Sequence, residues 1–211
     1  MKITHHLDDA TLMSCSAGSQ PEALAAVVTS HLAVCPRCRS ELKKHALIGE
    51  ALFESLKPEP VSREVPVAAA RIEAGAGAGA ADEAEMPEAL TAALEGRFDD
   101  IPWRRAAPGI WHFPIDLSEG AKGDLRLIKV APGIKLPEHG HGGTELTLVL
   151  DGAYRDEFGT FRRGDVADLG DDVEHRPVAD PEYGCICLAG SDARPRFTGM
   201  FARLLQPLAG L

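Results

Sequence analysis

The sequence predicts a two-domain α + β protein, with a small helical bundle at the N-terminus and an all-β, jelly-roll-like barrel after it. Three observations predict this arrangement. Over the first 56 residues, apolar residues recur at three- and four-residue steps, which is helical spacing. Residues 57–85 are rich in Pro, Ala and Gly, which is typical of a linker. From residue 101 onward, short apolar runs alternate with Gly, Pro and Asp, as they do in sandwiches and barrels.

Three helices are predicted in the first 56 residues. One runs from Leu7 to about Ala17 with Thr4 as its candidate cap, and the next runs from Pro21 to near Ala33. Pro36 disfavours helical geometry at the residue before it and suits a first helical turn, so a third helix is expected to begin there. One face of this third helix carries apolar and small residues: Leu42, Ala46, Gly49, Phe53 and Leu56. Because so small a bundle has little hydrophobic core, an additional cross-link is expected to hold its helices together.

The linker divides the chain into two predicted domains. The helical domain spans residues 1–85, with the linker at about 57–85, and the barrel spans residues 86–211. Two segments beside this boundary, 63–75 and 87–97, are candidates for one more helix, and the second has the better amphipathic pattern. Strands are expected at four apolar runs: Leu125–Val130, Glu145–Leu150, Ala153–Glu157 and Gly184–Leu188.

Composition excludes several classes of function. The net charge of -10 disfavours direct nucleic-acid binding, which needs a basic surface, and suits a protein partner better. No apolar stretch is long enough to span a membrane, and the N-terminus lacks the apolar core of a signal peptide, so a cytoplasmic location is expected. An odd number of cysteines, five, argues against a disulfide framework in such a protein and favours metal binding or redox chemistry.

The N-terminal domain contains a metal-ligand pattern. Three candidate ligands fall within eight residues: His31, Cys35 and Cys38. A structural zinc site takes four ligands drawn from Cys and His. His6, near the start of the first helix, is expected to supply the fourth, while His5 is the competing candidate and Cys15 a weaker one. Zinc bound there would tie together helices that cannot pack stably alone.

The pattern of His6 followed by His31-x3-Cys35-x2-Cys38 resembles the zinc-binding anti-sigma domain. That resemblance implies a partner, an extracytoplasmic-function sigma factor, whose access to RNA polymerase the domain blocks. It also implies a fourth, more mobile helix that contacts the sigma factor. Residues 63–75 and 87–97 are both candidates for this helix.

A second metal-ligand pattern lies in the predicted barrel. His139 and His141 are two residues apart, so they share one face of a strand, and Glu145 follows a Gly-Gly turn that can return its carboxylate to the same point. Gly164-Asp165 indicates a tight turn between strands, and His175, in the strand region after it, is the expected fourth ligand. Imidazoles with a carboxylate suit Zn, Fe, Mn or Ni.

These residues resemble the cupin family. The first cupin motif, G-x5-HxH-x3-E-x6-G, is complete from Gly133 to Gly152. The second motif is partial, because Gly164 and His175 fit it while three positions depart from it: Gly170, Asp172 and Ala179. The departures affect turn geometry more than the metal. The resemblance implies a cupin barrel that holds zinc or another divalent metal.

Together, the two modules resemble the ChrR family of cupin-bearing anti-sigma factors over nearly the whole chain. The resemblance implies a transcriptional regulator without enzymatic activity, whose cupin domain is needed to release the sigma factor under oxidative stress such as singlet oxygen. Cys185 and Cys187, two apart on an expected strand, are candidate redox residues, or else small core residues. One alternative is a metal-dependent cupin enzyme, a dioxygenase or isomerase, with a regulatory helical domain. Another is a sensor of a small ligand.

Overall fold

Three helices form the N-terminal part of the chain, as the spacing of its apolar residues predicts. The computed structural model describes residues 2–57, 88–140, 142–193 and 196–197. The three N-terminal helices are α1 (Asp9–Ser16), α2 (Glu22–Val34) and α3 (Pro36–Glu54). Just before the first strand come α4 (Glu88–Leu94) and a short 3-10 helix, η2 (Phe98–Asp100). The predicted helix at 87–97 is therefore confirmed as α4, and the candidate helix at 63–75 lies outside the described residues.

The ends of the helices follow from local chemistry. Asp8 caps α1, because its side chain accepts a hydrogen bond of 2.6 Å from the backbone N–H of Thr11. The expectation that Thr4 caps this helix was wrong, since the chain is still extended there. Cys35 has extended backbone angles and is the N-cap of α3, while Pro36 occupies its first turn, as predicted.

An antiparallel barrel follows the helices, as the alternation of short apolar runs predicts. The main sheet has the order β1-β2-β3-β10-β5-β6, with β7 and β9 also paired to β5, and a second sheet has the order β11-β4-β8. The strands are β1 (Arg104–Ala107), β2 (Ile110–Pro114), β3 (Asp124–Val130), β4 (His139–Gly140), β5 (Glu145–Asp156), β6 (Gly159–Arg162), β7 (Val166–Leu169), β8 (Glu174–His175), β9 (Val178–Ala179), β10 (Cys185–Ser191) and β11 (Arg196–Phe197).

Strand β5 joins two segments that the sequence predicts as separate strands. Gly152 interrupts the apolar run with a φ of 67°, and the pairing of β5 with β10 shifts register between Ile186 and Cys187. A bulge of this kind bends a strand without ending it. As a result, β5 is one continuous strand from Glu145 to Asp156. Both of these end residues belong to the barrel site described below.

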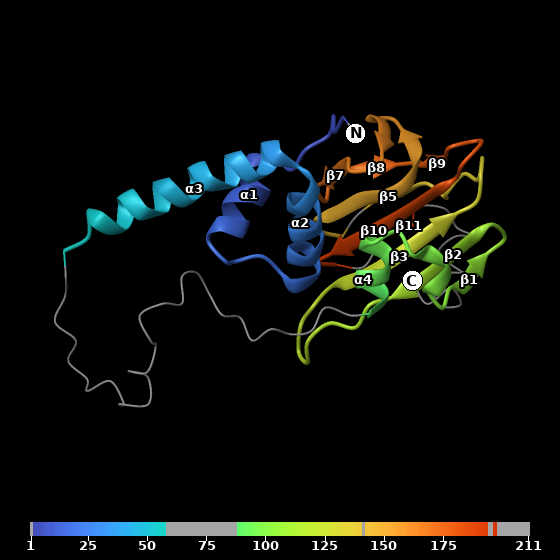
Figure 1. Cartoon of the computed structure of the whole chain (residues 1–211), viewed down its shortest axis with the longest axis horizontal. Coiled ribbons are helices and arrows are strands. Elements are labelled where there is room, and N and C mark those ends of the chain that lie inside the picture. Colours follow the sequence, from blue (N-terminus) through green and yellow to red (C-terminus); the bar gives the residue numbers. More distant parts are fainter. Residues whose placement is uncertain (1, 58–87, 141, 194–195, 198–211) are drawn as a thin grey trace.

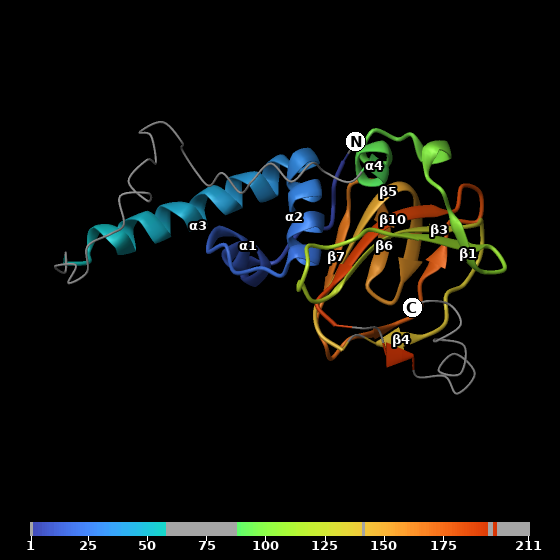
Figure 2. The ribbon, with the colours of Figure 1, turned by 90° about the horizontal axis from the view of Figure 1, so that it is seen from below.

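Helix α2 lies between the other N-terminal helices and the barrel, and α3 projects away from both (Figures 1 and 2). The buried side chains of α2 belong to the same core cluster as barrel residues such as Leu127, Leu146 and Leu188. The approach is close at Gly190 of β10, where an added Cβ would stand 2.5 Å from the Ala23 carbonyl oxygen and 2.8 Å from Val27 Cγ2. The helices and the barrel therefore share one hydrophobic core.

We expect Gly190→Ala to destabilise the protein by about 1–3 kcal/mol, because the added methyl group must push α2 off β10. Denaturant unfolding measures this change. The matched control is Gly49→Ala in α3, where an added Cβ meets nothing within 4 Å. Removing a helical glycine there is expected to stabilise by up to about 1 kcal/mol. Equal stability of the Gly190→Ala and wild-type proteins would contradict the close packing.

Candidate metal centres

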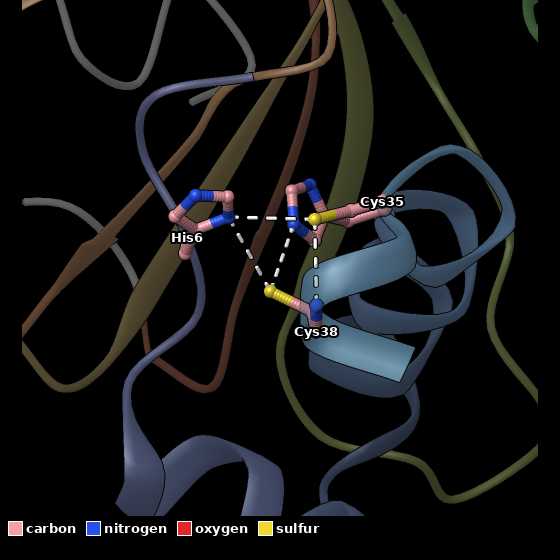
Figure 3. Close-up of side chains that lie close together, drawn as sticks. His6, Cys35 and Cys38 are labelled. Atoms are coloured by element: carbon pink, nitrogen blue, oxygen red, sulfur yellow. Dashed lines mark hydrogen bonds between the residues drawn. The ribbon is translucent and has the colours of Figure 1, made fainter. Parts of the chain in front are cut away.

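Four side chains from three separate elements meet at the junction of the N-terminal helices. His6 comes from the extended segment before α1, His31 from the last turn of α2, and the two cysteines from the start of α3. Figure 3 shows His6, Cys35 and Cys38 directed toward one another. His6 Nδ1 lies 3.3 Å from Cys35 Sγ and 3.7 Å from Cys38 Sγ, and His31 Nε2 lies 3.3 Å from Cys38 Sγ. The sequence thus predicted the members of this cluster.

The cluster has the donors and the spacing of a four-coordinate metal site. Its four ligand atoms all lie within 4.8 Å of one another. Tetrahedral zinc with bonds of about 2.0–2.3 Å places neighbouring N and S donors roughly 3.4–3.8 Å apart, close to the separations seen here. Three of the four residues are buried, so water has little access to the centre. The group can therefore hold a metal ion.

The two competing candidates do not join this cluster. His6 Nδ1 faces Cys35 and Cys38, whereas the neighbouring His5 lies outside the cluster. The His5 ring lies against Phe161 of the barrel, with ring centroids 4.2 Å apart. Cys15, on α1, is half-buried and packs against the hydrophobic core, where burial raises the pKa of its thiol.

Burial also sets the protonation of the cluster. It lowers the pKa of His31 to about 4 and raises the pKa of Cys38 to about 11. A neutral imidazole offers the lone pair that a metal needs, while the Cys38 thiol must lose its proton to become a ligand. Metal binding at this site is thus expected to release protons.

A second cluster lies in the barrel and contains three of the four residues predicted there. His139 of β4 pairs with His175 of β8, and Glu145 begins β5. Their ligand atoms lie within 4.8 Å of one another, and the two imidazole Nε2 atoms are 3.2 Å apart. The fourth predicted ligand, His141, lies outside the described residues. The Gly164-Asp165 turn forms between β6 and β7 as predicted, with Gly164 at a φ of 88°.

The outer nitrogens of both histidines have partners. His175 Nδ1 lies 2.9 Å from the buried Asp156 carboxylate, and His139 Nδ1 lies 2.9 Å from the carbonyl oxygen of Pro137. Such contacts fix the ring so that Nε2 faces the metal, as outer partners do in metal sites. Asp156 was missed in the sequence because nothing local distinguishes it among the 32 acidic residues.

The two remaining cysteines lie in the interior of the same barrel. Cys185 and Cys187 of β10 are both buried, and their Sγ atoms are 3.2 Å apart. A hydrogen bond with Cys185 and burial raise the pKa of Cys187 well above its usual value. Tyr154 is buried in the same cluster and its ring stacks on Phe161, with centroids 4.9 Å apart. The charge of Glu145 in the barrel cluster contributes to raising the pKa of both Cys187 and Tyr154, so these oxidisable side chains lie near the cluster.

Comparison with known proteins decides the family. A family model described as the ChrR cupin-like domain matches residues 92–193. The anti-sigma-E factor ChrR of Cereibacter sphaeroides is 37% identical over 213 residues, which cover 98% of each chain. The chain belongs to the ChrR family of anti-sigma factors. The resemblance inferred from the two ligand patterns is thereby confirmed, and the role that follows from this membership is regulatory and not enzymatic.

A solved structure supports the same membership. In the crystal structure of Rhodobacter sphaeroides SigE in complex with the anti-sigma ChrR, the matching chain is 34% identical. The match covers 90% of this chain and all of that one, with a TM-score of 0.71. Unlike the cupin-like match, which spans residues 92–193, this agreement extends over both the helical and the barrel parts. Within the described residues, no helix has the length and apolar character needed to cross a bilayer.

Helix α3 presents an exposed apolar surface. In this helix, all of which the structure describes, Cys38 is the one fully buried residue. The second half carries large apolar side chains in contact with solvent: Leu47, Ile48, Leu52, Phe53 and, just beyond the helix, Leu56. Phe53 is 77% exposed. Contiguous apolar surface of this kind marks a site of protein association.

Helix α4, unlike α3, packs its apolar residues against the protein's own core. Its residues Leu90, Ala92 and Ala93 are buried in the common core, so it covers the barrel. Of the two candidates for the fourth anti-sigma helix, the segment that includes α4 therefore already has its apolar residues buried in the core.

Proposed function

We propose that this protein sequesters an extracytoplasmic-function sigma factor with its N-terminal helices and so represses transcription that depends on that factor. The observation that carries the proposal is the exposed apolar surface on the second half of α3. This helix begins at the cysteine-histidine cluster and extends away from the barrel (Figure 1). The similarity to a ChrR that binds SigE supports the choice of partner. A cytoplasmic location and the absence of direct nucleic-acid contact are part of the same proposal.

The metal at the N-terminal cluster is proposed to be zinc, held by His6, His31, Cys35 and Cys38. Two thiolates and two imidazoles form a closed set that suits structural zinc. When bound, zinc would link the N-terminal segment to the two helices. The helical domain, proposed to span residues 1–85, would thus present α3 in one orientation.

The barrel, proposed as residues 86–211, is expected to hold zinc or another divalent metal with His139, His141, Glu145 and His175. Asp156→Asn is expected to weaken this metal binding by about 10–100-fold, because the ring of His175 loses its charged partner. Competition with chelators of graded affinity measures the change. Asp151→Asn, an exposed position on the same strand, serves as the control. Unchanged affinity in Asp156→Asn would contradict a metal role for His175.

We further propose that oxidation in the barrel, by singlet oxygen or a related oxidant, releases the sigma factor. Cys185, Cys187 and Tyr154 are buried together beside the barrel cluster, so oxidation there adds polar atoms to a packed interior. Purified complex exposed to light and a photosensitiser should dissociate more slowly when Cys185 and Cys187 are both replaced by Ser. Equal dissociation of the two complexes would exclude the cysteine pair as the sensor.

Co-expression with candidate sigma factors tests the main proposal. The full chain should co-purify with at least one extracytoplasmic-function sigma factor and inhibit transcription from the promoter of that factor in a purified system. A folded, metal-loaded protein that neither binds any such factor nor inhibits transcription would refute it.

A further inference from the structure

His6 is the one member of the N-terminal cluster that no helix holds in place. His31, Cys35 and Cys38 lie within eight residues on α2 and α3, whereas His6 lies in an extended segment before α1. Terminal segments are poorly ordered unless other groups bind them. When a metal ligand lies on such a segment, metal binding must also order the segment, and the lost conformational entropy weakens the binding. This cost is absent if other contacts in the protein already fix the backbone.

The barrel supplies that fixation through one carboxylate. Asp165, in the turn between β6 and β7, is 1% exposed, and its Oδ1 accepts hydrogen bonds from the backbone N–H groups of Thr4 at 2.6 Å and His5 at 3.0 Å. Its Oδ2 accepts from the N–H of Arg162 at 2.9 Å, which fixes the carboxylate in its own turn. Burial raises the pKa of Asp165, but these backbone hydrogen bonds outweigh it, so the net pKa is lowered and the group is an anion.

A second carboxylate anchors the segment on the other side of His6. Asp168 of β7 accepts a hydrogen bond of 3.1 Å from the backbone N–H of Asp8, the residue that caps α1. The His5 side chain lies on the barrel beside Phe161 and Gly159. Residues 4–8 are thus bound to the barrel before and after His6, whose Nδ1 lies 3.3 Å from Cys35 Sγ and 3.7 Å from Cys38 Sγ.

We propose that Asp165 is the positioning residue for His6, so that the barrel completes the metal site of the helical domain. This inference rests on the proposed zinc site at His6, His31, Cys35 and Cys38. Among the described residues, no hydrogen bond joins Asp165 to a ligand atom of the cluster, although its charge acts on His6 and His31. It acts by holding the backbone of the two residues before His6.

The same turn is joined to the second metal cluster. Strand β6 pairs with the end of β5, where Asp156 lies opposite Gly159, and β7 pairs with its start, where Glu145 lies opposite Leu169. The Phe161 ring on β6 contacts both Tyr154 of β5 and His5. The barrel cluster, the Asp165 turn and the N-terminal segment are thus linked by strand pairing and ring contacts.

Cobalt binding to the full chain tests the role of Asp165. Thiolate-to-cobalt absorption reports the N-terminal cluster alone, because the barrel candidates contain no cysteine ligand. Asp165→Asn keeps the shape of the side chain but loses the charge and one acceptor. Thr4→Pro leaves the barrel intact and removes the N–H that donates to Asp165. Asp180→Asn is the control, since Asp180 accepts from the N–H groups of Glu182 and Tyr183 in another barrel turn and does not contact the N-terminal segment.

We expect Asp165→Asn and Thr4→Pro to need roughly 10–100 times more free cobalt for half-saturation, the usual effect of losing an outer partner of a metal ligand. Their cobalt spectra should shift toward that of His6→Ala, and Asp180→Asn should match the wild type. Wild-type affinity and spectrum in both variants would overturn the inference. If Asp165→Asn does not fold, Thr4→Pro decides alone. A wild-type protein without the thiolate signature would instead refute the zinc site itself.

Discussion

Replacing Cys38 with Ala is expected to weaken sigma-factor binding by about 100-fold or more, which corresponds to about 2.7 kcal/mol. Cys38 is the one buried residue of α3 and also a member of the N-terminal cluster, so the substitution removes both the metal ligand and the anchor of the helix. The apolar half of α3 then loses its fixed orientation. Titration of a labelled sigma factor with wild-type and variant proteins measures the change.

Cys15→Ala is the matched control for this prediction. Cys15 is a thiol in the same helical domain, but it is half-buried on α1 and lies outside the cluster. Its replacement should leave both metal content and sigma binding close to wild type. A Cys38→Ala protein that lacks the N-terminal metal yet binds the sigma factor normally would show that the metal site is not needed for the interaction.

The double substitution Leu52→Glu and Phe53→Glu is expected to weaken sigma binding by roughly 30-fold or more, because an exposed aromatic residue on an interface face commonly contributes about 2 kcal/mol or more. Both side chains contact solvent, so the stability of the free protein should change by no more than about 0.5 kcal/mol per site. The two effects are separable by comparing binding with thermal unfolding of the unbound chain.

Tyr183→Glu controls for the added charge. Tyr183 is 72% exposed, close to the 77% of Phe53, but it lies in a turn of the barrel. Its substitution should not affect sigma binding. If it weakens binding as much as the α3 variant does, the barrel and not α3 forms the contact surface.

The sequence predicted best what depends on residues that are near one another in the chain. His31, Cys35, Pro36 and Cys38 define both a helix junction and three ligands within eight residues, and the structure places them as expected. The choice between His5 and His6 stayed open because both lie in one extended segment. Only packing against Phe161 decides which of the two side chains faces the barrel.

Residues that act through long-range contacts could not be found in the same way. Asp156 and Asp165 are acidic residues near turns, and their roles depend on partners 19 and 161 positions away in the chain. The continuity of β5 was missed because Gly152 has the appearance of a turn, whereas pairing with β10 keeps the strand together through a bulge. Helical periodicity identified a face of α3 that includes Phe53, but it does not tell whether the protein's own core covers that face.

Hydrogen exchange of the full chain, with and without its sigma factor, tests the central claim most directly. We expect binding to slow amide exchange in the second half of α3, from Ala46 to Leu56, while the barrel strands exchange at the rates of the free protein. Protection confined to the barrel, with α3 exchanging as in the free protein, would contradict it.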